Sequence, residues 1–272
     1  MKLFVCFLNV RNLKEMSSAI NYVEKFLEHQ PDTKFIILSG AGISTNAGIP
    51  DYRSNSRDLL NLFSKKMNRD EFIEHPLYCE FKEKCMNATP TLCHHLAEEL
   101  NKRNCLKRVY TQNVDGLYQR TGLSQDKIVE FHGSIADDSI VRYGDDIPKE
   151  AILQLLDDFN ISDPMIILVM GTSLQVYPFA AIPNLAPKRS VRILVNINTS
   201  SFLPKLSTLE YGFSHSIGSS PVTFSVQGAR KRRVRSEIEW GYGNHTRKKK
   251  WRDFLVTEDT DNFSEELLKI VR

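Results

Sequence analysis

Short apolar segments that end in glycine or polar residues most constrain how this chain can fold. The segment "KFIILSG" at 34–40 and the segment "MIILVMG" at 165–171 lack the polar alternation of a half-exposed strand. Such strands are typical of parallel sheets that are covered on both faces. Five segments have the character of strands: 34–40, 108–113, 128–133, 165–171 and 191–198.

Helical patterns separate these segments. Apolar residues recur at helical spacing in 13–29, and further helices are expected at 91–104 and 149–159. Another helix would start near Leu174, between the fourth and fifth strands. Strands that alternate with helices predict an α/β fold, a Rossmann-like parallel sheet with helices on both faces.

Ligands of open parallel sheets bind outside the carboxyl ends of the strands. Polar or glycine-rich loops follow all five predicted strands, after Leu38, Thr111, Phe131, Met170 and Val195. We therefore expect the binding site in these loops.

Composition narrows the class of protein. With 272 residues, the chain fits one large domain or a domain plus a tail. The net charge of +3 gives no global reason to expect direct nucleic-acid binding. No apolar stretch approaches the roughly 20 residues of a membrane span, so we expect no membrane partner.

Cysteine usage points to an intracellular protein. The five cysteines are Cys6, Cys79, Cys85, Cys93 and Cys105. An odd number without C-x-x-C spacing favours reduced thiols over disulfides. It also argues against a zinc site built on cysteine pairs, so no metal ligands are expected.

The loop "SGAGISTNAGIPDYRS" at 39–54 directly follows the first strand. Its glycines allow a tight turn and a close approach of the backbone to a ligand, while Ser44 and Thr45 can cap a helix that holds a phosphate. The glycines do not form a strict G-x-G-x-x-G, so a plain strand-to-helix turn is the alternative. The continuation "IPDYR" favours a lid over a charged, planar ligand.

Four other loops carry candidate residues. In "TQNVDGL" at 111–117, amides and one carboxylate suit ribose hydroxyls and a carboxamide, although Asn, Asp and Gly also make ordinary turns. His132 can act as a base near neutral pH, or it can be a structural histidine. The loops "GTS" at 171–173 and "NIN" at 196–198 can bind phosphate or ribose.

As an ordered set, "GAGIST", "TQNVDGL", "HG", "GTSLQV" and "VNIN" resemble the sirtuin family of NAD-dependent protein deacylases. The resemblance covers roughly 35–198 and the closing segment from Trp251. The segments "MGTSLQVYPFA" and "WRDFL" are most similar to the cytosolic and nuclear histone and tubulin deacetylases. The resemblance implies NAD as a consumed substrate and acetylated lysines of histone- or tubulin-class proteins as partners.

The resemblance implies a role for each matched residue. The pyrophosphate would be bound by Ala41, Gly42, Ile43, Ser44 and Thr45. The nicotinamide side would be covered by Asp51, Tyr52 and Arg53, and its ribose and carboxamide held by Gln112, Asn113, Val114 and Asp115. The adenosine side would be bound by Gly171, Thr172, Ser173, Asn196, Ile197 and Asn198.

His132 matches the family's general base. The acyl-lysine oxygen would attack the anomeric carbon of the nicotinamide ribose, nicotinamide would leave, and His132 would help to deprotonate a ribose hydroxyl. The implied products are free lysine, nicotinamide and O-acetyl-ADP-ribose. A histidine pKa near its ordinary value would suit this role.

The chain departs from the family directly after His132. Relatives carry a small zinc-binding module there, whereas only "IADD" separates "HGS" from "SIVRYGDDIP" in this sequence. We expect the module, between 134 and 139, and its zinc to be absent. The following segment resembles the substrate-binding strand, with Val141, Tyr143 and Gly144 in matching positions. Arg142 stands where relatives have an aromatic residue, and we expect its guanidinium to face solvent or to repel a lysine-derived chain.

Four regions are expected along the chain. They are an N-terminal helical segment (1–30), the NAD-binding domain (31–200), a Ser/Gly-rich and basic insert (201–250) and a closing segment with a short helix (251–272). The clusters "RKRRVR" and "RKKK" in the insert are compatible with nuclear import, nucleic-acid contact or a solvated surface. We expect the protein in the nucleus, the cytoplasm or both.

The expected absence of the zinc module leaves several functions open for this chain. The chain can be an active deacetylase with a minimal second domain, or an NAD-binding protein of this fold with weak or lost catalysis. It can also be a truncated gene product, or a non-enzymatic scaffold that binds partners through its C-terminal third.

Overall fold

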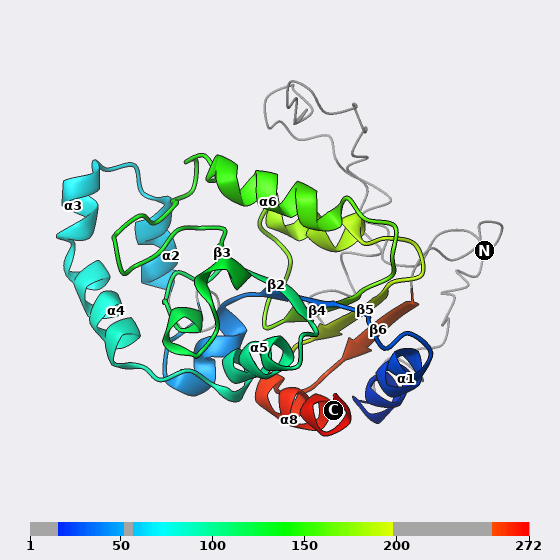
Figure 1. Ribbon diagram of the computed structural model, residues 1–272. Coiled ribbons are helices and arrows are strands. Elements are labelled where there is room, and N and C mark those ends of the chain that lie inside the picture. Colours follow the sequence, from blue (N-terminus) through cyan, green and yellow to red (C-terminus); the bar gives the residue numbers. More distant parts are fainter. Residues whose placement is uncertain (1–15, 52–56, 198–251, 272) are drawn as a thin grey trace, which may run out of the picture.

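The computed structural model describes residues 16–51, 57–197 and 252–271, and shows one six-stranded sheet in the order β3-β2-β1-β4-β5-β6 (Figure 1). The strands are β1 (Phe35–Ser39), β2 (Leu106–Thr111), β3 (Ile128–Glu130), β4 (Ile166–Met170), β5 (Val191–Val195) and β6 (Arg252–Val256). All neighbouring strands are parallel. The predicted Rossmann-like α/β fold is confirmed.

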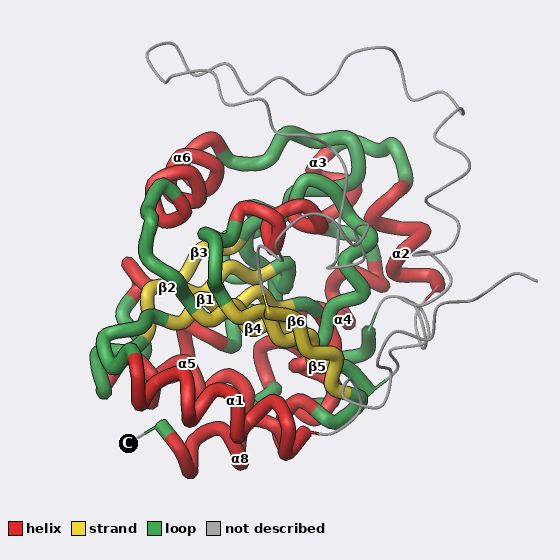
Figure 2. The backbone as a smooth tube through the Cα atoms, turned by 90° about the vertical axis from the view of Figure 1, so that its right-hand side faces the viewer, coloured by secondary structure: helices red, strands yellow, loops and turns green. Residues whose placement is uncertain are grey.

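Two helical layers cover the sheet (Figures 1 and 2). One layer contains α1 (Met16–His29), α5 (Leu92–Lys102) and α8 (Thr260–Ile270), and the other contains α6 (Lys149–Phe159) and the 3-10 helix η5 (Phe179–Leu185). Every residue of β1, β4 and β5 is buried. Strands with both faces covered in this way need apolar residues at successive positions, which is the pattern that the sequence shows.

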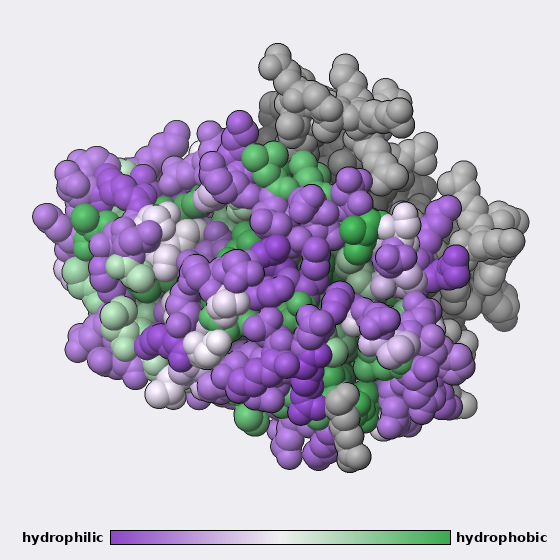
Figure 3. Space-filling model, in the orientation of Figure 1, coloured by the Kyte–Doolittle hydropathy of each residue, from purple (hydrophilic) through white to green (hydrophobic). Residues whose placement is uncertain are grey.

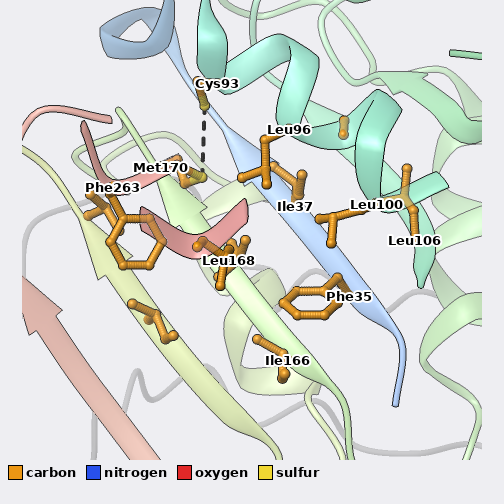
Figure 4. Close-up of a cluster of buried hydrophobic side chains, with 14 of the residues drawn as sticks. Phe35, Ile37, Cys93, Leu96, Leu100, Leu106, Ile166, Leu168, Met170 and Phe263 are labelled. Carbon is orange, nitrogen blue, oxygen red and sulfur yellow. Dashed lines mark hydrogen bonds between the residues drawn. The ribbon is translucent and has the colours of Figure 1, made fainter. Parts of the chain in front are cut away.

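Successive strand residues serve the two layers alternately. Ile37 belongs to the core beneath α5 and α8, while Ile36 and Leu38 belong to the core beneath α6. Leu96 of α5 and Phe263 of α8 lie in the same core as Ile37 (Figure 4). Hydrophilic residues cover most of the face shown in Figure 3, so the apolar faces of the helices are turned inward.

A third apolar cluster lies beside the sheet, at the left of Figure 1. It is built by α2 (Arg57–Ser64), α3 (Arg69–Ile73) and α4 (Pro76–Asn87). Val114 and Leu117 from the loop after β2, and Ile135 and Ile140 from the loop after β3, complete this cluster. The cluster therefore borders the carboxyl ends of these strands, where the ligand site was predicted.

The predicted helices agree with the structure except in one place. The bounds of α6 match the prediction, α1 and α5 differ only at their ends, and the closing helix is α8; residues 13–15 lie outside the described residues. The helix expected near Leu174 is wrong, because the turn begins only at Phe179 and is a 3-10 helix. Pro178 precedes it and Pro183 lies inside it, and proline lacks the N–H group that an α-helix requires.

Residues 139–148 do not form the expected strand. Arg142 to Asp145 make a turn, closed by a 3.0 Å hydrogen bond from Asp145 N to Arg142 O. Among the residues that the structure describes, no helix is long and apolar enough to cross a membrane.

A buried ion pair attaches β6 to the sheet. The Arg192 side chain on β5 is fully buried and contacts Asp253 of β6 through two hydrogen bonds of 2.7 and 2.8 Å. Arg192 also donates to Pro183 O at 3.2 Å and to Asn184 Oδ1 at 3.0 Å. The guanidinium thus links η5, β5 and the closing strand.

We predict that Asp253→Ala lowers the free energy of unfolding by about 3–5 kcal/mol, because it leaves the Arg192 charge buried without its carboxylate. Chemical denaturation measures this loss. The double variant Arg192→Met/Asp253→Leu is the control and should lose far less, since it removes both charges. A loss below about 1 kcal/mol in the single variant would contradict the ion pair's role.

Candidate functional site

The site is organised where the loops after β1 and β4 meet. These strands are neighbours in the sheet, and the chain continues from them in opposite directions, to β2 on one side and to β5 on the other. A crevice for a ligand forms at such a switch point. Gly40 N donates to Met170 O at 3.1 Å, and Gly42 N donates to Gly171 O at 2.8 Å, so the two loops are hydrogen-bonded to each other.

The glycines are required by this contact between the loops. A Cβ atom at Gly42 would lie 2.8 Å from Gly171 Cα, and one at Gly171 would lie 2.4 Å from Ile43 N. Gly171 also has a φ of +60°, which favours glycine. The glycine pattern therefore has a structural cause in addition to any close approach to a ligand.

Buried polar side chains join the β1 loop to the β2 loop. Ser44 on the 3-10 helix η2 (Ala41–Ala47) donates to Asp115 Oδ2 at 2.7 Å and accepts from Asn113 Nδ2 at 3.0 Å. Leu117 N donates to the other Asp115 oxygen at 3.1 Å. Burial raises the pKa of Asp115, and the hydrogen bond from Ser44 opposes that shift.

Gln112 is the point where three loops converge. Its Oε1 accepts from Thr172 Oγ1 at 3.2 Å, and its backbone is hydrogen-bonded to the His132 ring. Asn196 Nδ2 contacts Thr172 O at 3.4 Å, which brings in the loop after β5. The Gln112 Nε2 atom is buried and has no hydrogen-bond partner among the described residues. An unsatisfied buried amide is costly, and a polar ligand in the crevice would satisfy it.

His132 lies in the turn after β3 and is partly buried. Burial lowers the pKa of His132 below its ordinary value of 6.5, and the hydrogen bond to the Gln112 backbone acts in the opposite direction. The expectation of an ordinary pKa is therefore wrong. The imidazole is neutral at pH 7 and able to accept a proton.

The remaining residues that were predicted to bind the nucleotide differ in their exposure to solvent. Ala41, Thr45 and Ser173 are half-buried in the two glycine loops, whereas Ile197 is 62% exposed. Val114 is buried in the third cluster. Asp51 is half-buried, and Tyr52, Arg53 and Asn198 lie outside the described residues.

Comparison with known proteins now places the chain. The Sir2 family matches residues 40–142, which include the η2 loop, the β2 loop and His132. Over this stretch the chain is similar to the Sir2 family. One relative is the NAD-dependent protein deacetylase HST2 of Candida albicans, 32% identical over 207 residues that cover 60% of this chain and 62% of that protein.

For two other relatives, the match covers very different shares of the relative's own length. The NAD-dependent protein deacetylase of Thermotoga maritima is 28% identical over 70% of this chain and 92% of its own length. The NAD-dependent deacetylase sir2B of Dictyostelium discoideum is 27% identical over 75% of this chain and 33% of its own length. The chain thus spans less than two thirds of HST2 and one third of sir2B.

A short closed loop follows His132. Val141 N donates to His132 O at 2.9 Å, and Ser134 N donates to Ser139 Oγ at 3.0 Å. A Cβ atom at Gly133, whose φ is +73°, would lie 2.1 Å from Ser139 O. The two ends of the loop are therefore in contact, and glycine is required where they cross.

The loop is also fixed to the third cluster. Ile135 and Ile140 are buried there, and Ile135 N donates to Val114 O at 2.8 Å. Asp138 accepts from Lys82 Nζ at 2.7 Å and from the Tyr78 hydroxyl. Asp138 thus anchors the loop on α4, while Asp137 accepts from Ser139 N inside the loop at 3.0 Å.

The described residues do not suit the family's zinc. They contain no group of three or more His, Cys, Asp or Glu side chains that could hold a metal. Cys79, Cys85, Cys93 and Cys105 are free thiols. Burial raises the pKa of Cys85 to about 12, which disfavours the thiolate that zinc needs.

Arg142 does not take the position expected for it. Its Nη1 donates to Met67 O at 2.8 Å, and its guanidinium lies 5.2 Å from the centre of the Phe72 ring. It therefore packs on α3, and neither faces solvent nor enters the crevice. Tyr143 beside it is 55% exposed, while Val141 is half-buried and Gly144 is exposed.

The sequence analysis missed two residues that organise the site. Arg120 donates to Asp115 O at 3.3 Å and to Ala88 O at 2.7 Å, and so ties the β2 loop to α4. Burial raises the pKa of Glu130, two residues before His132, to about 7, and the negative charges of Asp115 and Asp137 add to this shift. A single carboxylate inside the otherwise apolar segment "IVEFHG" was the available signal.

We predict that Gly171→Ala lowers the free energy of unfolding by about 3 kcal/mol or more, because the new methyl combines an unfavourable φ with a clash against the η2 backbone. Chemical denaturation of the two proteins tests this. Gly48→Ala is the matched control, because Gly48 has a φ of +81° but nothing within 4 Å of its Cβ position. It should lose only about 1–2 kcal/mol. Equal losses in both variants would show that the contact between the loops is unimportant.

Proposed function

We propose that this chain is an NAD-dependent protein lysine deacetylase. Similarity to the Sir2 family over residues 40–142 and the names of the related deacetylases support this activity. The structural observation that carries it is the convergence on Gln112, where a buried amide without a partner lies beside the general-base candidate His132. A nucleotide bound at the switch point would satisfy that amide.

The residues at the switch point fit a dinucleotide. The backbone of η2 and the loop after β4 would hold the phosphates, and Thr172 and Asn196 would contact the adenosine side. Ser44, Asn113 and Asp115 form a buried, hydrogen-bonded wall for the nicotinamide side. When bound, NAD supplies the ADP-ribose that accepts the acyl group, and nicotinamide is released.

His132 would supply the base. Because burial lowers the pKa of His132, the imidazole is neutral near pH 7 and can take a proton from a ribose hydroxyl. Its hydrogen bond to the Gln112 backbone fixes the ring beside the crevice. Binding of the nucleotide and proton transfer by His132 would therefore both depend on Gln112 of the β2 loop.

The class of protein substrate and the location in the cell are also part of the proposal. We propose acetylated histone- or tubulin-class proteins as substrates, and the nucleus or cytoplasm as the location. The basic clusters at 230–235 and 247–250 that suggest nuclear import lie outside the described residues. The exposed Tyr143 and the missing strand at 139–148 favour one competing function, NAD binding with weak or lost catalysis.

We predict that the full chain, incubated with NAD and an acetylated histone peptide, forms nicotinamide, O-acetyl-ADP-ribose and free peptide in equal amounts by mass spectrometry. His132→Ala should lower the rate about 10²–10⁴-fold and leave NAD binding intact, because it removes only the base. Thermal stabilisation by NAD without any product would support the non-catalytic function. No stabilisation by NAD would contradict both functions and favour a scaffold.

We predict that the acid limb of kcat/KM lies below pH 6.5. The neutral form of His132 is the active one, and its lowered pKa keeps that form populated at lower pH. Rates from pH 5 to 8 measure the limb, with NAD binding followed at each pH to exclude unfolding. Glu130, whose pKa is raised to about 7, is the competing group. The limb should persist in Glu130→Gln, and its disappearance there would assign it to Glu130.

A further inference from the structure

The outer end of η2 contacts the start of the C-terminal helix. Asn46 Nδ2 donates to Asp261 Oδ2 at 2.9 Å and lies 3.2 and 3.3 Å from the two Asp259 oxygens. These partners are 213 and 215 positions away in the sequence. The nucleotide loop is thus joined to the closing segment by an exposed side chain.

Asp261 also joins α8 to α5. Its second oxygen accepts from Cys93 N at 2.7 Å, one of the N–H groups that the first turn of α5 leaves without an intrahelical partner. Asp259 caps α8 by accepting from Asp261 N at 2.8 Å. The starts of the two helices therefore form one hydrogen-bonded corner.

The same corner holds η2 at a second point. Thr91, which precedes α5, donates from Oγ1 to Ile43 O at 3.0 Å. Thr91 N donates in turn to the Nδ1 atom of the fully buried His94 at 3.1 Å. The opposite side of η2 contacts Gly171. The loop is thus fixed between the β4 loop and the α5–α8 corner.

The corner is rigid while the contact with Asn46 is adjustable. Phe263 and Leu267 of α8 are buried in the core shared with α1 and α5, so α8 is held firmly. Asn46 itself is exposed, and its hydrogen bonds are the outermost part of the connection. A change at this point would alter the loop without disturbing the core.

We propose that Asn46 and Asp261 are positioning residues, and that the closing segment sets the affinity for the nucleotide by holding η2 in shape. The proposal rests on the proposed function in taking a nucleotide as the ligand of η2. In this proposal the two residues act by holding the geometry of η2 and not through their charge. The carboxylates beside a phosphate-binding loop would by themselves repel the phosphates.

Two variants separate geometry from charge. Asn46→Asp replaces the donor by a third carboxylate, and should raise Kd and KM for NAD about tenfold with little change in kcat. Asp261→Asn removes a negative charge but sets two amide groups against each other, and should raise Kd about fivefold. A purely electrostatic role predicts the reverse for Asp261→Asn, a lower Kd.

The double variant Asn46→Asp/Asp261→Asn exchanges donor and acceptor. It restores the hydrogen bond between positions 46 and 261, and the amide introduced at position 261 still has an oxygen for Cys93 N. The carboxylate introduced at position 46 still faces the two Asp259 oxygens, so Kd should recover only in part, to a value below that of Asn46→Asp. Asn61→Asp on α2 makes the same charge change at another exposed position and should leave Kd unchanged.

Isothermal titration with NAD and amide hydrogen exchange of residues 41–48 test the proposal on the full chain. Exchange of the loop should be faster in both single variants and slower in the double variant than in Asn46→Asp, even without NAD. An unchanged loop exchange, or a lower Kd in Asp261→Asn, would overturn the positioning role. A wild type that binds no NAD but shows the exchange pattern would overturn the proposed function and leave the positioning of the loop standing.

Discussion

The contact between the Gly42 and Gly171 backbones is the constraint on which the rest of the structure depends. It exists because β1 and β4 are neighbours in the sheet, so their loops leave the same edge and must share one space. A side chain at either position would separate the loops, since the nearest atoms would lie 2.4 to 2.8 Å from the new Cβ. Once the loops touch, Ser44 reaches Asn113 and Asp115, and Thr172 reaches Gln112. The polar wall of the crevice is thus a consequence of backbone packing.

Much of this fold follows from local chemistry that a sequence displays. Strands buried on both faces must be apolar throughout, and an amphipathic helix must repeat at its own period, so β1, β4 and α6 were predictable. Strand β6 was missed because Arg252 and Asp253 suggest a surface. That segment joins the sheet beside β5, where Asp253 pairs with the buried Arg192, 61 positions away in the sequence. Pairings between segments far apart in the chain leave no local pattern.

The residues of the site were predictable from the sequence, but their burial and their contacts with one another were not. Candidate residues of five loops lie together, as their positions after parallel strands required. The sequence did not show how deeply each side chain of the site is buried. The pKa of His132 is lowered and that of Glu130 is raised by the same cause, removal from water, acting on a base and an acid. The position of Arg142 depends likewise on its neighbours, since its guanidinium lies over the Phe72 ring and donates to the Met67 carbonyl.

The loop after His132 is short, and its two ends are in contact. Bringing the ends of a short loop together costs little entropy, and Gly133 removes the steric obstacle where the ends cross. Two buried isoleucines and the Lys82–Asp138 pair then fix the loop on α4. The pair is about one-third exposed on both sides, so it contributes modestly, and the isoleucines carry most of the attachment. The loop that follows His132 is therefore held mainly by hydrophobic contact with the cluster of α2–α4.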